Sequence, residues 1–142
     1  MIDLVALGRW SALPLRLAVG VVFLVHGAQK LFVFGPAGTA AFFEKIHVPA
    51  AGFTALVVIA VELLGGLALL LGAFTRVAAL LLAVDMLGAI LLVHLAAGFF
   101  LPSGYEFALT LLAATLSLVL MGAGPASIDA ALGLDGITRA RR

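Results

Sequence analysis

The chemistry that this sequence could perform depends on ionisable side chains set within long apolar stretches. These side chains are His26, Lys30, Glu62, Asp85, His94 and Glu106. An imidazole exchanges protons close to neutral pH, and a carboxyl group removed from water can hold or share a proton. We therefore interpret His26, Glu62 and Asp85 as candidates for proton handling. Lys30, His94 and Glu106 are candidates for holding a cofactor, with Lys30 as a fixed positive charge for an anionic head group or a reduced quinone.

These residues admit three other interpretations. His26 and His94 could ligate one haem, but the helical rise separates their depths by roughly 10 Å, which disfavours it. His26, Glu62 and Asp85 could bind a metal ion, although nothing in their spacing specifies one, and no metal site is predicted. Lys30 could instead form an ion pair with Glu62 or Glu106 that holds the helices in register.

The composition is that of a membrane protein. Of 142 residues, 65% are hydrophobic and 11% are charged, and the mean hydropathy is +1.31. Soluble domains contain about 45–50% apolar and about 25% charged residues. Cysteine is absent, which excludes disulfides, thiolate nucleophiles and iron–sulfur ligation by this chain. The net charge of +1, without a basic stripe, argues against binding to nucleic acid.

The sequence predicts an all-α fold, a four-helix transmembrane bundle in a single domain covering residues 1–142. A span needs about 20 predominantly apolar residues. The predicted spans cover about residues 13–34, 51–74, 76–100 and 105–122. Between the first two spans, Gly35 to Gly38 predicts a break in the chain, after which Thr39 opens a short interfacial helix on the membrane surface.

Lysine and arginine residues beside the spans predict the orientation. The side that holds both termini carries Arg9, Arg16, Arg76, Arg139, Arg141 and Arg142, whereas the other side carries Lys30 and Lys45. Both termini are therefore predicted to be cytoplasmic, including a tail at residues 126–142. Arg16 and Arg76 are predicted to snorkel toward water at the cytoplasmic edge.

The helical rise then predicts the depth of each ionisable group. Glu62 and Asp85 fall near the centre of the bilayer, and His26 lies within about one turn of them. Lys30, His94 and Glu106 fall roughly two turns from the centre, in the outer half. The spans are therefore expected to share one polar pocket that opens outward, with His94 and Glu106 at its mouth.

A series of short motifs covers residues 14–130. The motifs are Arg16 with Gly20, His26-Gly27 with Lys30-Leu31, Glu62 with Gly65-Gly66, Gly72 with Thr75-Arg76, His94 with Gly98-Phe99, Glu106, and Gly122-x-Gly124 before Ser127 and Asp129. In order and spacing they resemble the DoxX family of small four-span bacterial membrane proteins. The resemblance implies an inner-membrane protein linked to redox chemistry. Relatives include a subunit type of thiosulfate:quinone oxidoreductase and members that tether oxidative-stress enzymes to the membrane.

The leading functional hypothesis is a quinone-facing or proton-handling component of a membrane redox or oxidative-stress system. No residue pattern assigns the chain to an enzyme class or identifies a catalytic residue. One alternative is a non-enzymatic scaffold whose cytoplasmic tail recruits soluble redox enzymes. Another is a small-solute transporter, which would need a homo-oligomer because four spans are few for one chain.

Overall fold

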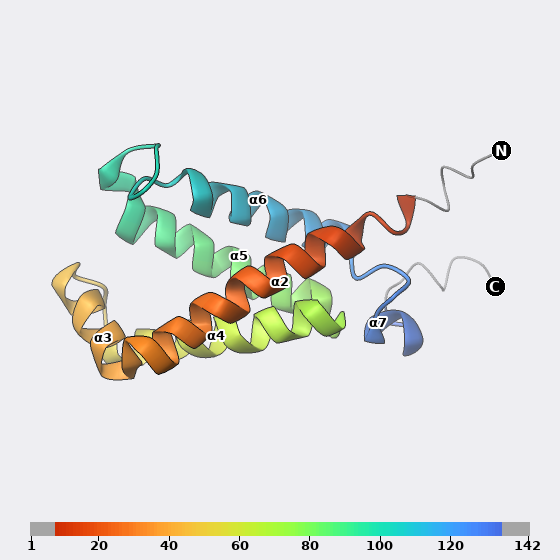
Figure 1. The fold of residues 1–142 in the computed structure, drawn as a ribbon, viewed down its shortest axis with the longest axis horizontal. Helices are drawn as coiled ribbons and strands as arrows, with labels where there is room; N and C mark the ends of the chain where they lie inside the picture. Colours follow the sequence, from red (N-terminus) through yellow and green to blue (C-terminus); the bar gives the residue numbers. More distant parts are fainter. Residues whose placement is uncertain (1–7, 135–142) are drawn as a thin grey trace.

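The computed structural model describes residues 8–134, and all regular structure in that range is helical (Figure 1). The elements are α2 (Ala12–Ala28), η1 (Gln29–Val33), α3 (Gly35–Lys45), α4 (Ala51–Leu71), α5 (Thr75–Ala89), η2 (Ile90–His94), η3 (Leu95–Ala97), α6 (Glu106–Met121) and α7 (Ile128–Ala131). The segments η1 and η2 are π-helical turns, and η3 is a 3-10 turn. The prediction of an all-α fold is confirmed.

Three continuous helical stretches are long and apolar enough to cross a membrane. They are Ala12–Val33, Ala51–Leu71 and Thr75–Ala97. The fourth apolar helix, α6, has 16 residues, a length of about 24 Å at the usual rise. The second and third stretches end three residues earlier than predicted. Gly72 and Gly98 end them with φ of 65° and 85°, values that glycine adopts at little cost.

The helices form two antiparallel hairpins. α2 packs along α4, and α5 packs along α6, with further contacts between α4 and α5. The hairpins lie close together at the end that holds α7 and diverge toward α3 (Figure 1). Small residues permit the close approach of α2 and α4, because a Cβ added at Gly66 would lie 2.6 Å from the backbone nitrogen of Leu24.

The break before α3 is shorter than predicted. Gly35 turns the chain with φ of 71°, and α3 begins at this residue rather than at Thr39. Pro36 lies in the first turn, where a helix needs no amide hydrogen from it. The prediction of a break over four residues was therefore wrong, since Gly35 alone provides it. The position of α3 at a membrane surface stays a prediction.

Arg16 does not snorkel, and this prediction was wrong. Its side chain is 2% exposed at the end where the hairpins meet. Nη1 donates to the carbonyl of Ala123 at 2.8 Å, and Nη2 donates to the carbonyl of Ala126 at 2.6 Å. The carbonyls beyond the end of α6 need donors that the helix cannot supply, and the planar guanidinium reaches two of them.

The predicted tail begins by folding back onto the bundle. The carboxylate of Asp129 is 5% exposed and accepts the backbone N–H groups of Phe74 at 2.7 Å and Thr75 at 2.8 Å. These bonds tie α7 to the start of α5. Residues 135–142, including three of the arginines that predict the orientation, lie outside the described residues, as do residues 1–7.

Candidate functional site

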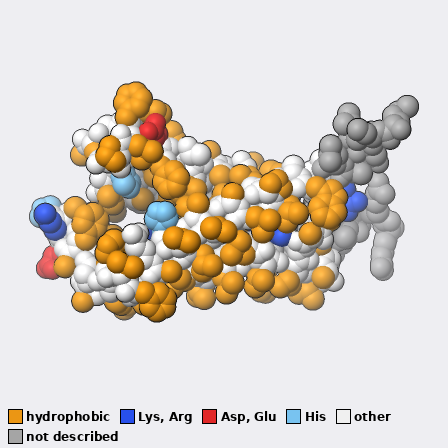
Figure 2. All heavy atoms as spheres, in the orientation of Figure 1, with side chains coloured by type: hydrophobic (Ala, Val, Ile, Leu, Met, Phe, Trp, Pro, Cys, Tyr) orange, Lys and Arg blue, Asp and Glu red, His pale blue; other side chains and the backbone are white. Residues whose placement is uncertain are grey.

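A cavity of about 1000 Å³ lies between the two hairpins on the side where they diverge. Its lining comes from α2, η1, α3, α4, α5, η2 and α6, and most of the lining side chains are apolar. The ionisable side chains that line it are His26, Lys30, Glu62, Asp85 and His94. Figure 2 shows a hollow between the two arms of the molecule, with histidine side chains beside it. The fold thus brings five of the six predicted candidates to one cavity.

Lys30 and Glu62 form an ion pair at this cavity. Nζ of Lys30 lies 2.9 Å from Oε1 and 2.7 Å from Oε2 of Glu62, so both carboxylate oxygens are engaged. Glu62 is 3% exposed, and the Lys30 side chain is 21% exposed. Of the two partners that the sequence left open for Lys30, the structure selects Glu62. A carboxylate as buried as that of Glu62 needs such geometry to offset its desolvation.

Asp85 faces the same cavity from the other hairpin. Its atom Oδ2 is buried and has no hydrogen-bond partner within residues 8–134. The carboxyl group is close enough to Glu62 and Lys30 to interact with both electrostatically. A buried polar atom without a partner costs about 1–3 kcal/mol, so it is a candidate contact for a ligand.

The two histidines are held in the same way on opposite hairpins. Nδ1 of His26 lies 2.9 Å from the carbonyl of Val22, and Nδ1 of His94 lies 2.9 Å from the carbonyl of Ser103. A carbonyl oxygen can only accept, so Nδ1 carries the hydrogen in each ring. In the neutral imidazole, Nε2 is then left as an acceptor.

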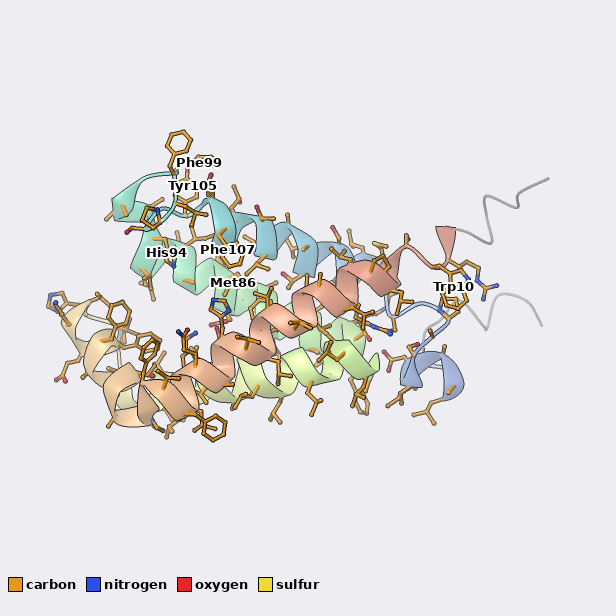
Figure 3. All side chains as sticks on the ribbon, viewed as in Figure 1. Trp10, Met86, His94, Phe99, Tyr105 and Phe107 are labelled. Atoms are coloured by element: carbon orange, nitrogen blue, oxygen red, sulfur yellow. The ribbon has the colours of Figure 1, made fainter. Side chains whose placement is uncertain are left out.

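An aromatic ring bridges the hairpins beside His26. The rings of His26 on α2 and Phe107 on α6 have centroids 6.2 Å apart. Figure 3 shows Phe107, Met86 and His94 on the α5–α6 side of the molecule, and all three line the cavity. Phe107 was not predicted as a site residue, since one more aromatic residue in an apolar span carries no distinctive signal.

Glu106 does not line the cavity. Its Oε1 accepts the backbone N–H of Leu101 at 2.7 Å, so the carboxylate holds the loop that precedes α6. The carboxylate of Glu106, predicted to hold a cofactor, is therefore engaged with its own loop.

Within residues 8–134, no group of three His, Cys, Asp or Glu side chains is placed to hold a metal ion.

Thr39 was predicted only as the start of a helix, but it also lines the cavity. It is 4% exposed, and its hydroxyl lies 3.0 Å from the carbonyl of Gly35 and 3.3 Å from that of Lys30. Thr39 thereby fixes the corner between η1 and α3.

The two π-helical turns were not predicted either, although η1 carries Lys30 and η2 carries His94. Such turns occur frequently at functional sites.

Comparison with known proteins identifies the family. The family model described as DoxX matches residues 11–95, which is more than half of the chain. The chain belongs to the DoxX family. The resemblance inferred from the motifs is thereby confirmed.

Three relatives of this DoxX protein show how far the likeness extends. The chain is 38% identical to "Putative oxidoreductase CatD" of Bacillus subtilis over 84% of each chain. It is 46% identical to "Uncharacterized membrane protein Rv3486" of Mycobacterium tuberculosis over 63% of this chain and 55% of the relative. It is 35% identical to an "Uncharacterized protein" of Haemophilus influenzae over 81% of this chain and 85% of the relative.

No solved structure matches the chain. The long apolar helices and the relative named as a membrane protein together establish a multi-pass membrane protein whose helices contact the lipid bilayer.

Proposed function

We propose that this DoxX protein binds a quinone or its reduced form in the cavity between the hairpins and handles protons there. It would act as a component of a membrane redox or oxidative-stress system. The observation that carries the proposal is the cluster of ionisable side chains on the wall of an otherwise apolar cavity of about 1000 Å³. A quinone has matching parts, since its apolar tail suits the lining and its polar ring suits the cluster.

Each residue has a role in this proposal. His26, Glu62 and Asp85 exchange protons with the ligand, because their groups face one cavity and interact with one another or with Lys30. Lys30 and His94 orient the ring from opposite hairpins. Ionisable residues within a membrane protein mark functional pathways more often than packing. The relative named as an oxidoreductase supports a redox setting.

The test is quinone binding by purified protein in lipid nanodiscs. We expect saturable binding of a decyl-substituted 1,4-benzoquinone, reduced at least tenfold in Glu62→Gln and in Lys30→Met. Glu44→Gln and Lys45→Met are matched controls, because these two residues are exposed on α3 and do not line the cavity. A well-folded wild-type protein that binds no quinone would contradict the proposal and favour the scaffold hypothesis.

We also propose that α6 completes a four-span bundle in the bacterial inner membrane, with both termini in the cytoplasm. The packing of α6 along α5 supports this, as does the position of Arg76 in the first turn of α5, next to the connection from α4. The natural chain lacks cysteine, so single cysteines report topology cleanly. We expect a membrane-impermeant maleimide to label Ser103→Cys before cell lysis and Leu134→Cys only after lysis. The opposite pattern would reverse the orientation.

A further inference from the structure

We propose that the cavity selects the reduced, dihydroxy form of its ligand over the oxidised, dicarbonyl form. This inference rests on the proposed function and deepens it. A hydroquinone carries two O–H groups that donate hydrogen bonds, whereas the oxygens of a quinone only accept them. The preference of the site therefore depends on whether its walls supply acceptors or donors.

The histidines supply acceptors on both walls. Because Nδ1 of His26 and Nδ1 of His94 each donate to a backbone carbonyl, the neutral rings offer Nε2 as an acceptor. His26 lies on α2, and His94 lies on η2 in the other hairpin. A ring with hydroxyl groups on opposite edges matches acceptors that are placed on opposite walls.

Asp85 adds a third acceptor. Its Oδ2 is buried against the cavity without a hydrogen-bond partner in the described part of the chain, and when the carboxyl group is ionised this oxygen is a strong acceptor. A ligand O–H that reaches this atom would relieve the cost of leaving it unsatisfied. A quinone carbonyl oxygen at the same place is itself an acceptor, so it would form no hydrogen bond with this carboxylate oxygen.

Most side-chain donors on the cavity wall are already engaged. Nζ of Lys30 donates to both carboxylate oxygens of Glu62, which leaves one of its three hydrogens. The hydroxyl of Thr39 donates to backbone carbonyls, and that of Thr54 donates to the carbonyl of Pro49 at 2.8 Å. Acceptors therefore outnumber available donors among these side chains, which favours a ligand that donates.

The first arm of the test compares three ligands that share one ring and one tail. They are decyl-1,4-benzoquinone, its hydroquinone and the dimethyl ether of the hydroquinone, titrated without oxygen against protein in lipid nanodiscs. The ether keeps the shape of the hydroquinone but has no O–H donor. We expect the hydroquinone to bind at least about tenfold more tightly than the other two, equivalent to about 1.4 kcal/mol.

The second arm removes the acceptors one at a time. In His26→Asn and His94→Asn the amide nitrogen can still bond the backbone carbonyl, but Nε2 is lost. We expect the preference for the hydroquinone to fall to about threefold or less, because the affinity for the hydroquinone should fall more than that for the quinone. His47→Asn is the matched control, because His47 does not line the cavity. Asp85→Asn replaces an acceptor with a group that can donate, and we expect it to shift the preference toward the quinone.

The outcomes separate this inference from the function on which it rests. If none of the three ligands binds, the proposed function fails and the inference fails with it. If the quinone binds as tightly as the hydroquinone, or more tightly, the function stands and the inference is wrong. An unchanged preference in all the cavity variants would likewise overturn the inference. Circular dichroism and size-exclusion chromatography report whether each variant has folded.

Discussion

The two ends of the bundle use buried polar groups in opposite ways. At the closed end, where the hairpins meet, Arg16 and Asp129 are each bonded to two backbone groups. At the open end, where the hairpins diverge, Lys30 is bonded to Glu62, while Asp85 leaves one oxygen without a partner in the described residues. At the closed end the Thr75 hydroxyl also lacks a hydrogen-bond partner in the described residues, but it does not line the cavity, whereas the unpartnered oxygen of Asp85 does. The closed end therefore uses its charged groups to satisfy the backbone, and the open end holds its charged groups beside a cavity.

This difference shows why burial of a charge does not by itself identify a functional site. Arg16 is more deeply buried than Lys30, yet its guanidinium has a structural task, which is to satisfy carbonyls beyond the end of α6. The side chains at the open end face space that a ligand can fill. The partner of a buried charge is therefore more informative than its depth.

The largest expected effect is at the closed end. Arg16→Met should lower the free energy of unfolding by about 3–6 kcal/mol, since two hydrogen bonds from a charged group are lost at about 1.5–3 kcal/mol each. Arg76→Met is the matched control, because Arg76 also donates to two carbonyls, those of Val119 and Leu120, but is exposed. Denaturant titration in detergent measures both variants. Equal losses would break the distinction between the ends.

Gly72→Ala should have the next largest effect. Gly72 has φ of 65°, and an added Cβ would overlap the Arg16 guanidinium and the Cβ of Ser127. Backbone strain of about 1–2 kcal/mol and overpacking of about 1–3 kcal/mol should together destabilise the protein. At Gly52, by contrast, an added Cβ meets nothing within 4 Å, so Gly52→Ala should not destabilise. Thermal unfolding of the two variants side by side would show whether the closed end is as tightly packed as we infer.

At the open end, the ion pair should matter more for binding than for folding. Lys30→Met and Glu62→Gln each leave one charge without its partner, so each single variant should be less stable than the wild type. The double variant should regain stability to within about 1 kcal/mol, because an uncharged pair avoids the desolvation cost. Quinone binding should remain lost in the double variant. If the double variant binds normally, the ion pair serves packing alone.

The sequence predicted the open end better than the closed end. Helical rise and the predicted orientation placed Glu62 and Asp85 near the bilayer centre, His26 about one turn away, and Lys30 and His94 roughly two turns outward. The fold brings these five residues to one cavity. The depth of a residue depends only on its position along a span, so it can be predicted without knowing how the helices pack.

Contacts that depend on how the helices pack could not be predicted from the spacing of residues in the sequence. Arg16 meets the carbonyls of Ala123 and Ala126 across more than 100 residues of sequence, so its burial follows from how α2 and α6 dock. Glu106 was expected at the cavity, but it bonds Leu101 a few residues away. The π-helical turns leave no mark on composition, because one extra residue in a turn changes neither hydropathy nor charge.

The smallest expected effect tests whether the corner between η1 and α3 positions the ligand site. Thr39→Val keeps the volume of the side chain but removes the hydroxyl that holds the carbonyls of Gly35 and Lys30. Stability should fall by about 1 kcal/mol, the usual contribution of one hydrogen bond. Thr115→Val is the matched control, since Thr115 is also buried and also donates to a carbonyl four residues earlier but lies outside the cavity.

Only Thr39→Val should also weaken quinone binding, by about two- to fivefold. This corresponds to a loss of less than about 1 kcal/mol of binding free energy, which is the contribution of Thr39 to positioning the ligand site. The two variants should therefore lose similar stability but differ in affinity. Equal affinity would mean that η1 holds Lys30 in place without help from α3. The open end would then owe its geometry to the ion pair with Glu62 and to the π-helical turn, rather than to the corner that Thr39 closes.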